Sequence, residues 1–286
     1  MSHRDIQIPE ALRNNYIYLR SLSEGSGKIW LAKDLHSEES VVIREINGLS
    51  SYEAVEQLQH EIEKLKSVHV RGVPKYYNLV QASSPELTSY LIQEYIPYPS
   101  LQSYLDKGQI FSERDVLNIL YYLGEILHEL QDSYPAPILH RDIKPSNILY
   151  NPMHDRVEVF LVDFAVLTDI SAGTYGYMAP EALLCKSTIQ TDYYALGATA
   201  VHLLCGIPPY DMACVDFRLK FEDTLMSRGC SISLEFYKLL FSLLDPNISG
   251  RPANADELMA SISKFKTIAT PELHIKTSLW RRLFHF

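Results

Sequence analysis

Residues 138–149 read ILHRDIKPSNIL and carry the strongest structural signal in the chain. An apolar segment with an acidic end, VEVFLVDFA, follows at 157–165, and GTYGYMAPE follows at 173–181. The informative positions of the first motif are His140, Arg141, Asp142, Lys144 and Asn147. At about 5% usage per residue type, five fixed positions arise by chance in roughly one chain in 10^4. Three such motifs in this order therefore exclude coincidence.

The three motifs resemble the catalytic segment of eukaryotic-like protein kinases of the bacterial type, and the resemblance extends over residues 14–266. It implies that Asp142 orients a substrate hydroxyl and accepts its proton, and that Lys144 reaches the γ-phosphate of ATP. Lys144 together with Thr174 is typical of the serine/threonine branch. The expected reaction is therefore transfer of the γ-phosphate to serine or threonine hydroxyls of a protein substrate.

The same resemblance implies a magnesium site and two structural braces. Asn147 and Asp163 are expected to supply hard oxygen ligands to Mg2+, which neutralises charge on the transferring phosphate. Asp192 is expected to hold the catalytic loop from a central helix. Arg251 is expected to pair with Glu181 of the APE motif.

The segment that corresponds to the glycine-rich loop departs from the family pattern. SLSEGSGKIW at 21–30 keeps Gly25 and Gly27, which allow close backbone approach to phosphates, but it is one residue short. In the VAIK-like strand, VVIR places Arg44 where the family has a lysine that pairs with Glu61. Arginine stays charged, yet its planar fork is longer than an ammonium group. We therefore expect an Arg44–Glu61 ion pair and altered placement of the ATP phosphates.

The resemblance assigns the rest of the ATP site to side chains around the adenine and to the hinge segment. These positions are Ile29, Val42, Gln93, Glu94, Ile96 and Leu149. Gln93 is the gatekeeper, and the backbones of Glu94 and Ile96 are expected to bond the adenine. Val42 adds bulk above the ring, and Ala165 replaces a flexible glycine after Asp163. These departures predict reduced activity.

Two competing functions stay open. A pseudokinase would use the same fold as a nucleotide sensor or a scaffold for a partner, without phosphate transfer, and the altered nucleotide motifs favour it. A phosphotransferase acting on a small molecule fits poorly, because Thr174, the APE motif and Asp192 match the branch that acts on proteins. Retention of Asp142, Lys144, Asn147 and Asp163 favours an enzyme.

Apolar periodicity predicts an α+β chain with two lobes. Alternating segments predict strands at 16–22, 28–34, 40–46 and 87–95. Helical spacing predicts helices from near Ser50, from Ser112, and at 192–205, 233–244 and 254–266. Glu61 lies on the apolar stripe of the first helix. It either reaches water from the edge of the stripe or faces inward, where a buried carboxylate needs a cation. The expected organisation is an extension at 1–13, a kinase domain at 14–266 divided near residues 95 and 96, and a tail at 267–286.

Composition and charge exclude several classes of protein. The 286 residues are 47% hydrophobic and 21% charged, as in a folded globular chain. A net charge of −9 disfavours general binding to nucleic acids. The sequence has no run of about 18 apolar residues, so we expect no transmembrane segment. The cysteines are expected to be buried thiols in a reducing compartment, the cytoplasm, and are Cys185, Cys205, Cys214 and Cys230.

The last residues mix apolar and basic side chains. The sequence ends in SLWRRLFHF, where Trp280, Leu283 and Phe284 flank Arg281 and Arg282. A frayed end or a strip that docks onto the same chain is the simplest interpretation. A helix that binds a partner and an anchor on anionic membrane stay open as alternatives.

Overall fold

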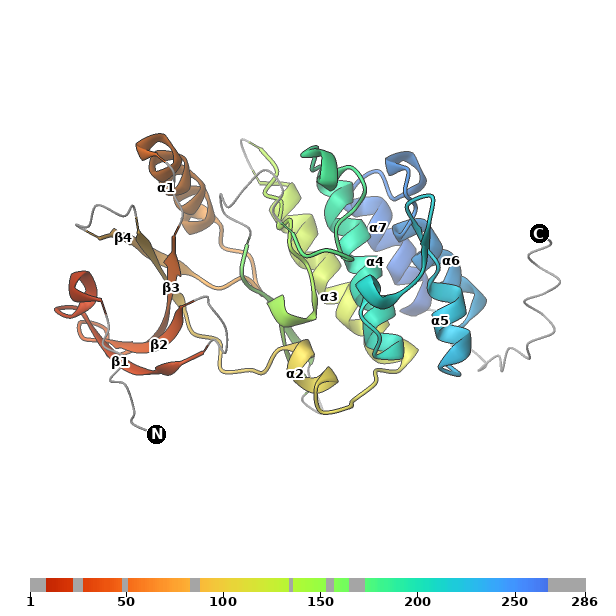
Figure 1. The fold of residues 1–286 in the computed structure, drawn as a ribbon, viewed down its shortest axis with the longest axis horizontal. Helices are drawn as coiled ribbons and strands as arrows, with labels where there is room; N and C mark the ends of the chain where they lie inside the picture. Colours follow the sequence, from red (N-terminus) through yellow and green to blue (C-terminus); the bar gives the residue numbers. More distant parts are fainter. Residues whose placement is uncertain are drawn as a thin grey trace. The chain divides into compact units, whose positions relative to one another are not determined.

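The computed structural model describes residues 9–22, 28–47, 51–82, 88–133, 136–152, 157–164 and 173–266. Figure 1 gives the order of the helices and strands. The chain divides into two compact units. The N-terminal unit holds the described residues up to His69 and those from Val73 to Pro97, and the C-terminal unit holds Val70–Gly72 and the described residues from Tyr98 onward. A strand-rich unit followed by a mainly helical one confirms the predicted α+β class.

Four positions or segments of interest lie outside the described residues. They are Gly25, Gly27, Ala165 and the tail at 267–286.

The N-terminal unit is built on one antiparallel sheet with strand order β1-β2-β3-β5-β4. Its strands are β1 Tyr16–Ser21, β2 Ile29–Asp34, β3 Ser40–Ile46, β4 Tyr76–Gln81 and β5 Ser89–Glu94. The four strands predicted from alternation are confirmed. Strand β4 was not predicted, because its sequence YYNLVQ does not alternate cleanly between apolar and polar residues.

The two faces of this sheet have different roles. One face forms a core whose members are Leu12, Tyr16, Trp30, Ala32, Val41, Ile43, Tyr90 and Ile92. Successive side chains of a strand point to opposite faces. The alternate residues of β2, β3 and β5 therefore lie on the other face, where several of the expected ATP-binding residues are found.

Helix α1, Tyr52–Ser67, packs against β4 in the same unit (Figure 1). Its N-cap is Ser51, whose hydroxyl accepts a hydrogen bond of 3.3 Å from the amide of Ala54. The predicted apolar stripe is confirmed, since Leu58 and Ile62 are fully buried. The helix begins close to the predicted position, because the serine cap satisfies an amide that the first turn leaves unpaired.

The C-terminal unit contains six α-helices among its described residues. They are α2 Leu101–Leu105, α3 Glu113–Gln131, α4 Ile189–Cys205, α5 Phe221–Ser227, α6 Leu234–Leu243 and α7 Ala255–Ser263. Helix α4 packs against both α3 and α6 (Figure 1) and is buried on all sides from Thr191 to Cys205. Such a helix at the centre of the unit is a rigid support for the loop that precedes β6.

Two short hairpins complete the described part of this unit. Strands β6 Ile148–Pro152 and β7 Val157–Leu161 form the first, and β8 Cys214–Val215 and β9 Arg218–Leu219 form the second. The four predicted helices of this unit are confirmed with small shifts at their ends. Helix α4 starts three residues earlier than predicted, at Ile189. Helix α7 ends at Ser263 and continues as a 3-10 turn, Lys264–Lys266.

The cysteine prediction is wrong for two of the four residues. All four thiols are free, but Cys185 and Cys214 are exposed, whereas Cys205 is buried and Cys230 is partly buried. Cys185 follows a short 3-10 turn with φ of 60°, and Cys214 lies on the two-residue strand β8. Both belong to surface connections. Among the described helices, none is long and apolar enough to cross a membrane.

Candidate active site

A buried carboxylate holds the loop that carries the main motif. Asp192, in the first turn of α4, accepts hydrogen bonds from the amides of His140 at 2.9 Å and Arg141 at 2.8 Å. Burial raises the pKa of Asp192 to about 6, against the lowering effect of the two amides. Arg141 has φ of 66°, a disfavoured conformation for a residue with a side chain. The predicted bracing role of Asp192 therefore has a physical basis, since its two bonds fix this turn.

His140 links the catalytic loop to the end of strand β7. Its ring is fully buried, and Nε2 lies 2.9 Å from the carbonyl oxygen of Val162. Its Nδ1 lies 3.3 Å from the amide of Asp142. Because an amide only donates and a carbonyl only accepts, these partners assign the neutral tautomer with the proton on Nε2. The ring also packs on Phe164, with centroids 4.5 Å apart.

Asp142 is the centre of a hydrogen-bonded cluster of side chains. Its Oδ2 accepts from Lys144 Nζ at 2.7 Å and from Asn147 Nδ2 at 2.9 Å, and its Oδ1 accepts from the Thr174 hydroxyl at 2.8 Å. Lys144 Nζ also donates to Thr174 Oγ1 at 2.6 Å. The structure thus brings Asp142, Lys144, Thr174 and Asn147 together, although Thr174 lies 32 residues from Asp142 in sequence. These donors fix the orientation of the carboxylate, a group that can accept a proton from a hydroxyl.

The register of the first hairpin places the two expected metal ligands at the same end. Ile148 pairs with Leu161, and the amide of Val162 donates to the carbonyl of Asn147 at 2.9 Å. Asp163 is the next residue, with φ of 67°. The amide nitrogen of Asn147 is engaged by the backbone and side chain of Asp142. The Asn147 oxygen accepts a bond of 3.3 Å from the Ser146 hydroxyl and has a second lone pair. An amide oxygen and a carboxylate are a donor set that fits Mg2+.

The expected ATP-binding side chains of the N-terminal unit share one face of its sheet. Strand pairing sets Ile29 opposite Arg44, and Val42 opposite Gln93. These residues alternate with the core residues, so they lie on the face opposite the core cluster. The face combines apolar side chains with one guanidinium. Leu149 belongs to the other unit, on strand β6.

The hinge residues begin at Glu94, the last residue of strand β5. The amide of Glu94 donates to the carbonyl of Lys75 at 2.8 Å, and the amide of Lys75 donates to the Glu94 carboxylate at 3.0 Å. This reciprocal pair fixes the backbone at Glu94. Ile96, two residues on, is buried.

The ion pair between Arg44 and Glu61 stays a prediction, and the ion pair that the structure gives Glu61 is with a lysine of its own helix. Glu61 binds Lys64, three residues along the same helix, at 2.7 Å, and its side chain is 40% exposed. This partial exposure agrees with the alternative in which Glu61 reaches water from the edge of the apolar stripe. The opposite charge at i+3 was the signal that sequence reasoning missed, because such neighbours meet on a helix surface. Lys28, next to the glycine loop, pairs with Glu45 at 2.9 Å.

The ion pair predicted between Arg251 and Glu181 is confirmed. The guanidinium makes two bonds to the carboxylate, at 2.6 and 3.0 Å, and both residues are buried. Thr191 adds a third bond to Glu181 at 3.0 Å, which sequence reasoning did not identify. The cluster ties the end of the segment containing Thr174 to α4 and to the turn before α7.

The described residues between Gly173 and Glu181 have a second anchor. Tyr177 and His202 are buried, and the tyrosine hydroxyl lies 2.7 Å from Nδ1 of the histidine. Burial lowers the pKa of His202 to about 4. Gly176 has φ of 91°, and a Cβ there would lie 2.7 Å from the backbone nitrogen of Tyr210. Only glycine permits this close approach.

Comparisons with known proteins agree with this arrangement. The serine/threonine-protein kinase sid1 of Schizosaccharomyces pombe is 28% identical over 207 residues, covering 68% of this chain and 42% of that protein. Serine/threonine-protein kinase D of Synechocystis is 32% identical over 226 residues, covering 70% of this chain and 42% of that protein. The receptor protein-tyrosine kinase CEPR1 of Arabidopsis thaliana is 29% identical over 208 residues, covering 65% of this chain and 21% of that protein.

The chain thus spans less than half the length of these three relatives. A family model described as the protein kinase domain matches residues 16–262. That range contains the Asp142 cluster, both expected metal ligands and the described sheet of the N-terminal unit. The chain therefore belongs to the protein kinase domain family.

Proposed function

We propose that this chain is an ATP- and Mg2+-dependent kinase that phosphorylates serine or threonine hydroxyls of proteins. The observation that carries the proposal is the cluster in which Asp142 accepts bonds from Lys144, Asn147 and Thr174. The Lys144–Thr174 bond of 2.6 Å joins the two residues that are typical of the serine/threonine branch. Because one of the similar proteins is named a tyrosine kinase, the proposed choice of hydroxyl rests on these two residues.

Phosphoryl transfer depends mainly on positioning and on stabilising charge. In the proposed reaction Asp142 orients the incoming hydroxyl and accepts its proton. Lys144 contacts the transferring phosphate while Thr174 keeps the ammonium group beside Asp142. The rigid support of α4, acting through Asp192, keeps this geometry when substrate binds.

Asn147 and Asp163 would hold the magnesium ion. The bound ion would supply positive charge against the phosphate oxygens. The residues around it keep the ligand oxygens in place, since the Asn147 amide is anchored on Asp142.

The nucleotide would contact the sheet face that carries Ile29, Val42, Arg44 and Gln93, together with the backbones of Glu94 and Ile96. In this proposal Gly25 and Gly27 approach the phosphates, and Leu149 lies under the adenine. Arg44 supplies the positive charge for the α- and β-phosphates.

A pseudokinase is the second candidate, and one observation favours it. Glu61 is bound to Lys64, so the acid that the family pairs with its strand lysine is engaged elsewhere. A misplacement of about 1 Å costs on the order of a hundredfold in rate. Under this candidate the chain would bind nucleotide or a protein partner without turnover.

A labelled ATP assay on the purified full chain separates the two candidates. The wild type is compared with Asp142→Ala, Arg44→Lys and the double variant Arg44→Lys/Lys64→Ala, which frees Glu61. Transfer by the wild type that falls on the order of 10^2–10^4-fold in Asp142→Ala supports the kinase. No transfer by the wild type, with a gain in the double variant, supports the pseudokinase.

Two further assignments belong to the same proposal. We place the protein in the cytoplasm, because its four thiols are free and free thiols persist in a reducing compartment. Its partners are protein substrates rather than nucleic acids, given the net charge of −9. The proposed catalytic domain is 14–266.

A further inference from the structure

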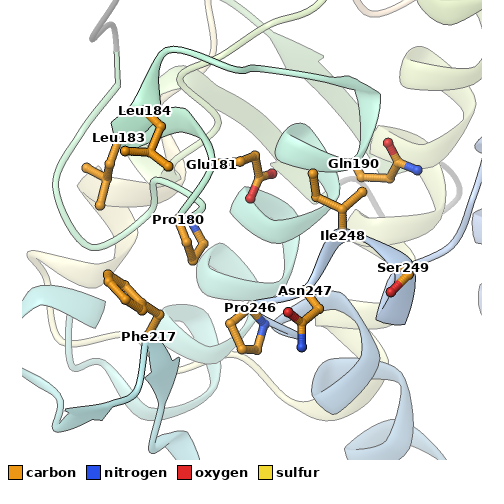
Figure 2. Close-up of a pocket in the computed structure, with 10 residues that line it drawn as sticks. All are labelled: Pro180, Glu181, Leu183, Leu184, Gln190, Phe217, Pro246, Asn247, Ile248 and Ser249. Carbon is orange, nitrogen blue, oxygen red and sulfur yellow. The ribbon is translucent and has the colours of Figure 1, made fainter.

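An open apolar groove lies on the C-terminal unit beside the APE segment (Figure 2). Its volume is about 790 Å³. The apolar lining, called here the APE groove, consists of Pro180, Leu183, Leu184, Phe217, Pro246 and Ile248. Leu184 is 69% exposed and Phe217 is 65% exposed. An apolar surface gathered in one hollow marks an interaction site more often than scattered exposed side chains do.

One of these side chains, Phe217, lies in a turn with a strained backbone. Asp216 and Phe217 form the turn between β8 and β9, with φ of 49° and 62°. This conformation favours asparagine and glycine over a bulky aromatic residue. The turn nevertheless presents the Phe217 ring at the rim of the APE groove (Figure 2). A strained, exposed aromatic residue points to a function that needs it there.

The charge around the APE groove selects what can occupy it. Glu181, the acid in the lining, is neutralised by its two bonds to Arg251. The exposed Asp216 is the residue before Phe217 in the same turn. An occupant with apolar side chains and adjacent basic ones therefore complements both the apolar lining and this acid.

The last twenty residues of this chain have that composition. They contain Trp280, Leu283 and Phe284 around Arg281 and Arg282, and they carry three basic and one acidic side chain in a chain of net charge −9. The described structure ends at Lys266 in the C-terminal unit. Fourteen residues span up to about 46 Å when extended. A unit of about 170 residues has a radius of gyration of about 15 Å, so Trp280 can reach the APE groove.

A second hollow, beside Phe265, fits this segment less well. Only Leu239 and Phe265 in its lining are apolar residues. Glu235 is paired with Lys238 at 2.8 Å, so Lys264 leaves the lining with a positive charge that does not complement Arg281 and Arg282. We propose that the C-terminal segment 267–286 docks in cis into the APE groove, with Trp280, Leu283 and Phe284 on the apolar lining and the two arginines toward Asp216.

Tryptophan fluorescence tests this docking on the full chain. The protein has two tryptophans, and Trp30 is buried in the N-terminal unit, 4% exposed. The signal of Trp280 is obtained by subtracting the spectrum of Trp280→Phe. We expect it to be blue-shifted and protected from acrylamide. In Leu184→Ser/Phe217→Ser the quenching constant should rise to that of a free peptide of residues 270–286.

A matched control changes an exposed leucine outside the APE groove. Leu234→Ser, at a residue that is 41% exposed, should leave the Trp280 signal unchanged, and Arg281→Glu/Arg282→Glu should weaken the protection. An unchanged melting temperature establishes that each variant folds. Quenching of wild-type Trp280 as in the free peptide overturns the proposal. Three other results also overturn the proposal. They are protection of Trp280 that is not lost in the groove variant, protection that disappears on dilution as it would for binding to a second copy, and protection that requires phosphatidylserine vesicles.

Discussion

Arg251 binds Glu181 through two parallel hydrogen bonds in the interior of the C-terminal unit. The Arg251 side chain is fully buried, so removing it leaves a buried carboxylate without its counter-charge. We expect Arg251→Ala to lower the free energy of unfolding by about 3–5 kcal/mol. Urea denaturation measures this difference.

The exposed pair Lys238–Glu235 provides the comparison for that variant. Lys238→Ala should change the free energy of unfolding by less than about 1 kcal/mol, because water screens the pair. Equal losses in the two variants would contradict a special role for the buried pair.

Thr174 is expected to position the charged groups of the candidate site rather than to react. Thr174→Ala removes one bond to Asp142 and one to Lys144. Loss of a charge-assisted bond of about 1.5–3 kcal/mol predicts a fall in kcat on the order of 10–100-fold. Thr174→Ser keeps the hydroxyl and should restore most of the rate. Steady-state kinetics separates kcat from KM, and failure of serine to restore kcat would argue against the hydrogen bonds.

We expect replacement of Asp192 to lower both the stability and the activity of the protein. Asp192→Ala leaves the amides of His140 and Arg141 without acceptors in a buried site. Each unsatisfied amide costs about 1–3 kcal/mol. Asp192→Asn keeps one acceptor oxygen and should lose roughly half as much. Thermal unfolding measures the loss, and an Asp192→Ala protein as stable as the wild type would refute the bracing role.

We expect the free energy of unfolding to depend on pH through His202. Its pKa in the folded protein is about 4, below its ordinary value of 6.5, because burial disfavours the charged ring. Between these values the unfolded chain binds a proton that the folded chain does not, so stability decreases as the pH falls from 6.5 to 4. The contribution lost is about 3 kcal/mol.

A comparison with His202→Gln isolates this contribution. Asp192, whose pKa is raised to about 6, acts in the opposite direction over a similar range but is present in both proteins. The difference in unfolding free energy between wild type and His202→Gln should therefore follow His202 alone. Parallel pH profiles for the two proteins would show that His202 does not titrate in this range.

The sequence predicts the catalytic loop well because the information there is local. Asp142, Lys144 and Asn147 lie within six residues, and the last two both donate to the carboxylate of the first. The contact of Arg251 with Glu181 was also predictable, since each belongs to a motif with a known counterpart. Periodicity located the long helices for the same reason: a stripe of buried residues repeats every turn.

Side-chain partners, short elements and local turns could not be predicted in this way, because hydrophobic periodicity does not encode them. Glu61 has Arg44 as its expected family partner, and the structure also pairs it with Lys64, three residues along the helix. Strand β6 and the short helix α2 have only five residues each, too few for a period to be visible. Cys185 is exposed because it lies in a left-handed turn, and the local sequence does not predict that turn.

The acceptor geometry of Asp142 has a directional consequence. A carboxylate offers about four lone-pair positions, and three are taken by the ammonium, the amide and the threonine hydroxyl. The fourth is on Oδ1, beside Thr174. Under the proposed function, an arriving alcohol would therefore have a single angle of approach to Asp142, set before any contact with the nucleotide is made.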